Sequence, residues 1–464
     1  MDTDEYHLAS AQTPLGLLQR GRGAGFLWAL GHAEEARPLL VRCITRDPRW
    51  DRQLESRAPY YAEIALAVGL DLSPLERHLR EHDDANRDGY GSLLAVETLH
   101  AMACAGSDEA LRMQGDYIAY GAHWDTALHG LVVLANANEL PLIPGAQQAL
   151  DGLLAAVRAR FSNHEALVAA LDREWPDYEP WRQWAQRDTE IAAALAEAEA
   201  GYLRSQRPRT PAANLSTREI LARPDVRSFR RALAARCGGE NAALLLDAAR
   251  SGSGDAQAAA LIALGEQNDA RVLEPALSLL PSVPPPPASS WMRYAILRAL
   301  SGLPADPGLV YARKWYQTNN FVLRRSAENI FARHAEPEDA TMLREGAQRA
   351  FEEGDDYRVC DAMDALARIP QLGPYPEVRA VFDGHRYSRA RADAAAALAA
   401  TDPAFPRDRA FECLWDCDDS ARATGCAHVD LALPDARERL LRLASDPLEE
   451  EEVREAARDA QSRT

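Results

Sequence analysis

The chain has a single lysine, Lys314, among its 52 basic residues, and aromatic residues make up only 7% of its 464 residues. Long apolar runs are missing as well, since the longest, at 64–70 and 131–134, are far too short to cross a bilayer. The acidic first residues are not followed by the apolar stretch of a signal peptide. We therefore expect a cytoplasmic protein with no membrane segment. The use of arginine in place of lysine is typical of GC-rich bacterial coding sequences.

Signatures of catalysis and nucleotide binding are also missing. The sequence contains no G-x-S-x-G, no P-loop, no H-E-x-x-H and no dinucleotide-binding glycine pattern. It therefore predicts a protein that is not an enzyme and needs no cofactor. The seven cysteines are an odd number spread over a large chain, which favours buried thiols in a reducing compartment over a disulfide framework.

Acidic residues outnumber basic ones by 70 to 52, which gives a net charge of −18. A surface of that sign repels phosphate backbones, so nucleic acid is not the expected partner unless arginines gather on one face. The most visible acidic stretches are 336–339, 352–356 and 449–452. They predict a basic protein partner, and the alternative is an ordinary solvated surface.

A repeat organises the C-terminal half. Five arginines follow one another at intervals of 34, 33, 31 and 32 residues: Arg324, Arg358, Arg391, Arg422 and Arg454. A proline stands twelve or thirteen residues after each of the first four: Pro337, Pro370, Pro403 and Pro434. Met292 and Pro304 repeat the same spacing. The third residue after the anchor is small at Ala295, Ala327, Ala394, Gly425 and Ala457, with Asp361 as the exception.

This pattern predicts stacked helical hairpins. The small residue lets a neighbouring helix approach closely, the proline ends the first helix, and a second amphipathic run follows, as at 340–351 and 436–443. A single pair cannot bury its apolar face, so copies must stack. Period, helix pair and proline together resemble the HEAT-repeat family, including the shorter bacterial HEAT-like repeats, over about half the chain. The resemblance implies an all-α solenoid and carries no catalytic residue with it.

The rest of the chain suggests three domains. Residues 1–140 hold a looser repeat, because Trp50-Asp51 recurs as Trp124-Asp125 and the flanking residues recur at the same displacement. We expect diverged HEAT-like hairpins there, an irregular helical joint with a linker at 141–216, and regular repeats at 217–464. A proline-rich insert at 281–290 is expected to be extended.

The joint contains an aromatic segment that is our candidate partner-binding site. Its residues are Trp175, Asp177, Tyr178, Trp181 and Trp184. Exposed tryptophan and tyrosine dominate binding hot spots. The alternative is that these side chains are buried at the end of the first repeat block. This alternative is favoured because exposed aromatic patches are rare.

Three groups of residues resemble metal sites without completing one, so we expect no metal. The turn 84–89 begins like an EF-hand loop, but Ala95 stands where a bidentate glutamate belongs. His123, Asp125 and His129 lie close in sequence, although the earlier repeat copy has no such ligands. The weak zinc candidates are Cys413, Cys417, Cys426 and His428, whose alternative is apolar filling.

Taken together, the sequence predicts a non-enzymatic protein-binding scaffold or adaptor, in which an acidic solenoid groove holds a basic protein or peptide. Its oligomeric state is left open. One alternative is a nucleic-acid-acting solenoid related to HEAT-like DNA glycosylases, which would require arginines such as Arg227, Arg230, Arg231, Arg324 and Arg325 to converge. Another is an immunity or accessory protein for a bacterial toxin or secretion system.

Overall fold

A computed structural model of the chain describes residues 8–82, 90–136, 146–173, 179–205, 214–223, 225–284 and 290–463. Every regular element within these ranges is a helix, and they contain no strand. The predicted all-α class is therefore confirmed. None of the helices in these ranges is both long and apolar enough to span a bilayer.

Contacts divide the chain into two compact units. Unit 1 comprises Met1–Arg207, Asp383–Ala395 and Ala404–Thr464, and unit 2 comprises Pro208–Phe382 and Ala396–Pro403. The first change between units falls inside the joint predicted at 141–216. The predicted block 217–464 is divided differently from our expectation, because its last 61 residues group with the N-terminal half. The contacts responsible join residues more than 330 positions apart, which no local repeat pattern encodes.

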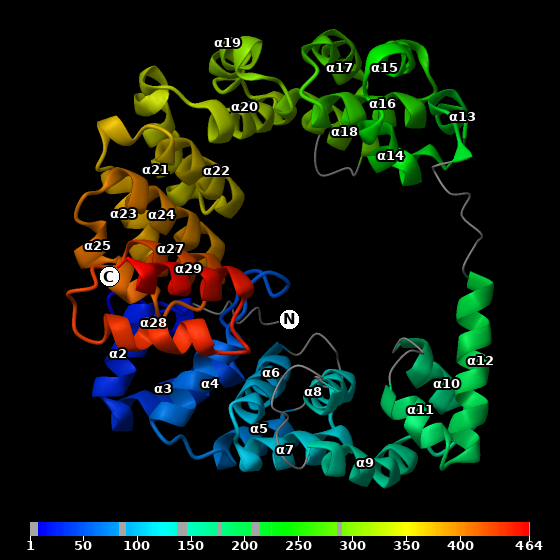
Figure 1. Cartoon of the computed structure of the whole chain (residues 1–464), viewed down its shortest axis with the longest axis vertical. Coiled ribbons are helices and arrows are strands. Elements are labelled where there is room, and N and C mark those ends of the chain that lie inside the picture. Colours follow the sequence, from blue (N-terminus) through cyan, green and yellow to red (C-terminus); the bar gives the residue numbers. More distant parts are fainter. Residues whose placement is uncertain are drawn as a thin grey trace. The chain divides into compact units, whose positions relative to one another are not determined.

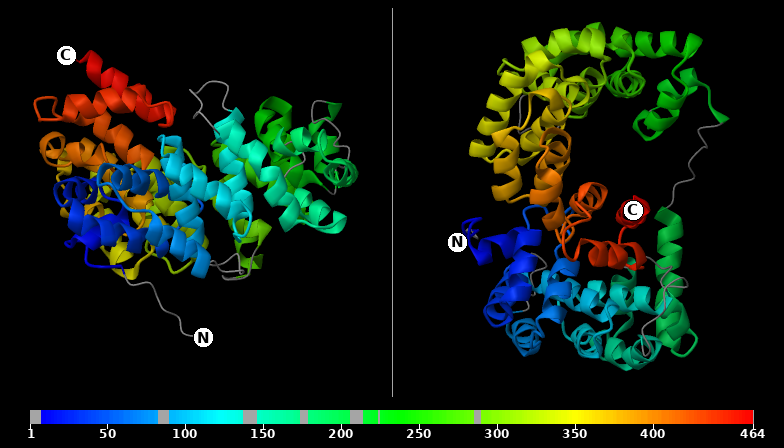
Figure 2. Two further views of the ribbon diagram at one scale, coloured as in Figure 1. Left: turned by 90° about the horizontal axis from the view of Figure 1, so that it is seen from below. Right: turned by 60° about the vertical axis from the view of Figure 1, so that its left-hand side comes forward.

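Unit 1 begins with helices in hairpin order and ends with a second group from the C-terminus (Figure 1). The first group is α1(Pro14–Arg20), α2(Gly23–Gly31), α3(Ala33–Thr45), α4(Ala58–Ala67), α5(Ser73–Glu81), α6(Tyr90–Cys104), α7(Asp108–Ile118), α8(Trp124–Asn136), α9(Ala146–Arg160), α10(His164–Arg173), α11(Glu179–Ala185) and α12(Thr189–Ser205). The second is α25(Phe405–Asp408), α26(Ala410–Cys413), α27(Asp419–His428), α28(Ala436–Ser445) and α29(Glu451–Ser462). In two views the orange and red C-terminal helices lie against the blue N-terminal ones, and α2 contacts α26 (Figure 2).

Unit 2 contains the middle of the chain. Its helices are α13(Thr217–Leu221), α14(Arg230–Ala235), α15(Gly239–Ser251), α16(Gly254–Glu266), α17(Leu273–Leu279), α18(Trp291–Ser301), α19(Ala305–Trp315), α20(Phe321–His334), α21(Ala340–Glu353), α22(Asp356–Ala367) and α23(Pro376–Gly384), and α24(Ser388–Thr401) crosses the boundary. Alternate helices pack on one another, α14 on α16, α16 on α18, α18 on α20 and α20 on α22. Each apolar face is therefore covered by the next pair.

The five anchor arginines occupy similar positions in their helices. Arg324, Arg358, Arg391, Arg422 and Arg454 all lie in the first turn of a helix, namely α20, α22, α24, α27 and α29. The small residues that follow, such as Ala327 and Ala394, are fully buried one turn later on the same face. Asp361 occupies this slot in α22 and forms an ion pair with Arg325 at 2.6 Å.

The repeated prolines begin the next element as much as they end the previous helix. Pro337 and Pro370 are the first residues of short 3-10 turns, and Pro304 is the N-cap of α19. Proline is well suited to these positions, because its missing N–H would have no helical partner there and its φ is already helical.

The acidic stretches are partly neutralised by arginines within the same unit. Arg313 forms ion pairs with Glu336, Glu338 and Asp339 at 2.7–2.8 Å. Arg422 holds Glu449 through two hydrogen bonds of 2.6 and 2.9 Å. These carboxylates therefore stabilise helix packing, and they contribute less to an acidic binding surface than their sequence density suggests.

Candidate functional site

The two ends of the chain meet in unit 1 through glycines that permit an unusually close backbone approach. The backbone N–H of Cys417 donates to the carbonyl of Gly21 at 2.9 Å, and Gly21 ends α1 with a φ of 68°. A Cβ placed on Gly23 would lie 1.8 Å from the carbonyl oxygen of Glu412. Only glycine fits at this contact between α2 and α26, because no side chain can occupy that space.

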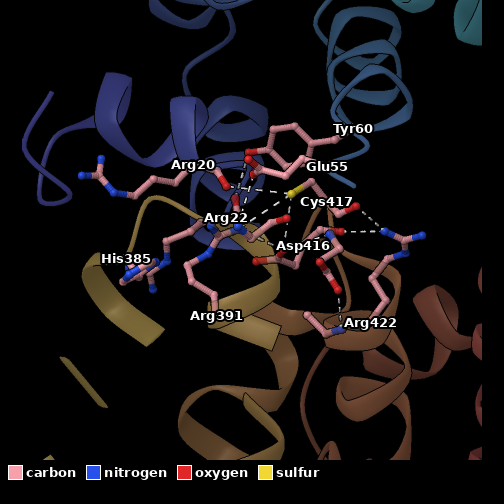
Figure 3. A network of polar contacts seen from close by, with 12 residues as sticks. Arg20, Arg22, Glu55, Tyr60, His385, Arg391, Asp416, Cys417 and Arg422 are labelled. Carbon is pink, nitrogen blue, oxygen red and sulfur yellow. Dashed lines mark hydrogen bonds and ion pairs between the residues drawn. The ribbon is translucent and has the colours of Figure 1, made fainter. Parts of the chain in front are cut away.

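A buried charge cluster joins these ends, made of Glu55, Arg57, Arg391, Asp416 and Cys417. Figure 3 shows Glu55, Arg391, Asp416 and Cys417 of this cluster. Arg57 donates to Glu55 at 2.6 Å and to the Cys417 sulfur at 3.2 Å, and Arg391 donates to Asp416 at 3.3 Å. Burial is the largest single influence on Glu55 and acts to raise its pKa, but the charges of Arg57 and Arg391 and the backbone N–H donors together outweigh it, so the pKa is lowered overall. Burial raises the pKa of the Cys417 thiol to about 12, so the thiol is neutral. The two guanidinium charges of Arg57 and Arg391 therefore balance the two carboxylate charges of Glu55 and Asp416.

A second set of contacts extends this junction from the loop between α1 and α2. Arg22 binds Glu412 with two hydrogen bonds of 2.8 and 3.0 Å and donates to the carbonyl of Asp383 at 2.7 Å. Arg20 donates to three backbone carbonyls, at 2.8–3.0 Å. Burial, together with repulsion from neighbouring arginines, lowers the pKa of Arg20 to about 10. An unpaired buried charge is costly, so an arrangement of the two ends that left Arg20 or Arg22 without these partners would be less stable.

The loop between α3 and α4, residues 46–57, is fixed by hydrogen bonds and ion pairs to buried side chains, and we call it the braced loop. One oxygen of the buried Glu55 carboxylate accepts from the backbone N–H groups of Trp50 and Asp51 at 2.7 and 2.9 Å. Arg49 binds Asp47 within the loop and Glu97 of α6, both at 2.8 Å. At its surface the loop exposes Leu54, which is 65% accessible.

Beside the braced loop lies a cavity of about 490 Å³, which we call the groove. Its floor contains Tyr60, Trp415 and Cys417, which are buried, and part of one wall is formed by His100 and Cys104 of α6. The lining also includes residues of α27 and α28 and of the segment 446–450. The groove therefore depends on the meeting of the two ends of the chain.

The groove carries an excess of negative charge. Its lining contains seven carboxylates against three guanidiniums, an excess of four: Glu63, Asp416, Asp418, Asp419, Asp446, Glu449 and Glu450 against Arg422, Arg439 and Arg442. Two of the arginines are already paired with lining carboxylates, Arg422 with Glu449 and Arg439 with Glu63. In the described part of the chain, Asp419, Asp446 and Glu450 form no ion pair, and all three are exposed. They are available to a cation in the groove.

No family model, curated protein or solved structure matches this chain. The site must therefore be interpreted from its own chemistry.

A cysteine and a histidine face each other in the groove without forming an activated nucleophile. The Cys104 sulfur lies 3.5 Å from Nε2 of His100, one turn earlier on α6. Burial raises the pKa of Cys104 to about 11 and lowers the pKa of His100. The pair is neutral near pH 7, because the thiol keeps its proton and the imidazole does not take it. The pair therefore does not supply a reactive thiolate near pH 7.

The aromatic segment is only partly within the described residues. Trp181 and Trp184 are buried, and their rings meet edge to face with centroids 5.3 Å apart. These two indoles therefore pack inside unit 1 and do not form the exposed anchors of our partner-binding hypothesis. Trp175, Asp177 and Tyr178 lie outside the described residues.

The cysteine candidates are separate buried groups. Cys413, Cys417 and Cys426 are all buried, and burial raises the pKa of each thiol. His428 contacts the ring of Phe405, with centroids 6.2 Å apart. Within the described ranges, no group of three or more His, Cys, Asp or Glu side chains is placed to hold a metal ion, which covers the His123 to His129 group too. The turn at Asp84 to Asp88 lies outside those ranges.

Of the groove residues that the sequence pointed to for a basic partner, Glu449 and Glu450 belong to the acidic stretch 449–452, and the groove itself was not predicted. Cys417 was noted only as a possible zinc ligand, and its contact with Arg57 spans 360 positions. One local signal was present, the close spacing of Gly21, Gly23 and Gly25 beside the paired arginines 20 and 22. Such a glycine cluster indicates close approach of another backbone, although it does not say which one.

Proposed function

We propose that the protein is a non-enzymatic, protein-binding scaffold built from HEAT-like helical hairpins, and that the groove of unit 1 holds a basic segment of a partner protein. The observation that carries the proposal is the groove itself, an open cavity of about 490 Å³ whose lining has four more carboxylates than guanidiniums. Charge complementarity of this kind selects basic partners and accelerates their association.

Two of the five arginines named for a nucleic-acid function, Arg227 and Arg325, are engaged with carboxylates of their own chain. Arg227 pairs with Asp255 at 2.6 Å, and Arg325 pairs with Glu328 and Asp361 at 2.9 and 2.6 Å. Arginines that neutralise carboxylates of their own chain offer little to a phosphate backbone. This supports a protein partner over a nucleic acid.

A selection experiment tests the proposal with the full chain. Random dodecamer peptides displayed on phage are selected against the immobilised protein, and the enriched peptides are expected to carry net positive charge. The best one, synthesised with a fluorescent label, is then titrated at about 50 mM and about 500 mM salt, where the Debye length falls from about 14 to about 4 Å. Binding should weaken steeply with salt.

Matched variants locate the binding site. The groove variant combines Asp419→Asn, Asp446→Asn and Glu450→Gln, and the control combines Glu240→Gln, Asp247→Asn and Glu266→Gln, all exposed, in unit 2. Each lost attraction is worth about 0.5–1 kcal/mol, so the groove variant should bind the peptide at least roughly tenfold more weakly than the unmodified protein. Equal loss in both variants, enrichment of neutral or acidic peptides, or tighter binding of duplex DNA than of peptide would each refute the proposal.

A further inference from the structure

The groove combines its available carboxylates with exposed leucines. Leu54 of the braced loop, Leu66 of α4 and Leu448 after α28 all line it, with exposed fractions of 65%, 39% and 50%. A single exposed leucine is ordinary on a protein surface, but three around one cavity form an apolar edge that a ligand would cover. Carboxylates alone would bind any cation, so the leucines indicate a further requirement.

The braced loop gives this apolar edge a fixed geometry. Asp51 accepts from the backbone N–H of Gln53 through its carboxylate at 3.0 Å, and from the N–H of Glu55 through its carbonyl at 2.8 Å. The side chain of Glu55 is fully buried and ties the loop to Arg57 and to the backbone N–H of Ser388. Leu54 is therefore presented by a turn that does not need to be ordered on binding, which lowers the entropic cost of association.

The size of the groove limits what can enter it. An α-helix 10–12 Å in diameter occupies roughly 400–600 Å³ per turn, so a cavity of about 490 Å³ takes little more than one turn. A helix of several turns would extend beyond this volume. An extended segment that inserts one or two side chains fits the volume better.

From these observations we propose that the groove recognises an extended peptide segment in which a bulky apolar side chain stands beside arginine or lysine. The apolar side chain packs on Leu54, Leu66 and Leu448, and the cation is held by Asp419, Asp446 and Glu450, two of which flank Leu448 in the segment 446–450. This inference rests on the proposed function, because it specifies which basic segment the groove binds. A small polyamine would satisfy the carboxylates and leave the leucines exposed.

A double-mutant cycle with the selected peptide tests the contact. Its partners are the protein substitution Leu54→Ala and replacement of the peptide's conserved apolar residue by alanine. Each change alone should weaken binding about tenfold, which corresponds to about 1.4 kcal/mol. Together they should weaken it little more than either alone, because both remove the same contact. Leu30→Ala is the control, since Leu30 is exposed on α2 of the same unit and does not line the groove.

The outcomes separate the inference from the proposed function. If selected peptides are basic but have no fixed apolar position, or if the cycle is additive, the inference fails and the charge-based function stands. If spermine displaces the peptide with similar affinity, the requirement for an apolar side chain is also refuted. If basic peptides are not enriched, both fail. Leu448→Ala provides a second variant, and hydrogen exchange of α4 and α28 verifies that each variant remains folded.

Discussion

Substituting Gly23 by alanine should separate the two ends of the chain in unit 1. The added Cβ would lie 1.8 Å from the Glu412 carbonyl oxygen, and the nearest tolerated distance is about 3.0 Å, so the backbones must move apart by more than about 1 Å. A shift of that size stretches the 2.9 Å bond from Cys417 N–H to the Gly21 carbonyl and the Arg22–Glu412 pair. Overpacking costs about 1–3 kcal/mol, and loosening a buried pair adds to it.

We therefore expect Gly23→Ala to destabilise unit 1 by about 3 kcal/mol or more. Gly31→Ala is the matched control, because Gly31 ends the same helix and an added Cβ there meets nothing within 4 Å. It should leave stability unchanged or raise it by up to about 1 kcal/mol. Because two units need not unfold in one transition, the assay is hydrogen exchange measured peptide by peptide, with α2, α4 and α26 compared against α16 and α18. Equal protection in both variants would refute the reasoning.

The other predictions concern titration, thiol reactivity and a repeat arginine. Burial raises the pKa of Asp361 to about 6, above its ordinary 3.8. Its contribution to stability is therefore greatest below pH 3.8 and is lost as the pH rises to about 6. In Asp361→Asn, the free energy of opening of α22, measured by hydrogen exchange, should lose this pH dependence, which amounts to at most about 3 kcal/mol. Cys417, with a pKa of about 12 in place of 9.0, should have a roughly thousandfold smaller thiolate fraction and remain unalkylated by iodoacetamide at pH 8 when the half-buried Cys237 has reacted, as read by mass spectrometry; equal rates would contradict this. Arg391→Met should destabilise unit 1 by about 3–5 kcal/mol because it leaves a buried carboxylate unpaired, whereas Arg458→Met, which breaks a pair exposed on both sides, should cost less than about 1 kcal/mol in urea unfolding.

Much of the local fold could be read from the sequence. The runs predicted at 340–351 and 436–443 are α21 and α28, and the anchor arginines fall in first helical turns, because proline placement and apolar spacing are local properties. The division into units could not be read in the same way. It depends on Arg57 meeting Cys417 and on Arg22 meeting Glu412, contacts between residues that no period connects.

The tryptophans of the N-terminal repeat show where local similarity fails. Trp50 and Trp124 occupy equivalent positions in the sequence repeat. Trp124 is 4% exposed and packs on Phe161, whereas Trp50 is 51% exposed, with the guanidinium of Arg386 3.5 Å from its ring centre. A sequence repeat determines the position of the side chain along its local element. What covers it depends on the neighbouring segment, which for Trp50 comes from the C-terminal part of unit 1.

Salt should separate the stability of unit 1 from its binding. The cluster of Glu55, Arg57, Arg391 and Asp416 is buried and balanced, so mobile ions cannot screen it, and the junction of the two ends should change little between low and high salt. Asp419 and Glu450 in the groove are exposed, and their attraction for a cation is screened. A salt concentration that releases a bound peptide should therefore leave hydrogen-exchange protection in α2 and α26 intact. Parallel loss of both would mean that the groove carboxylates act through the fold and not through direct contact.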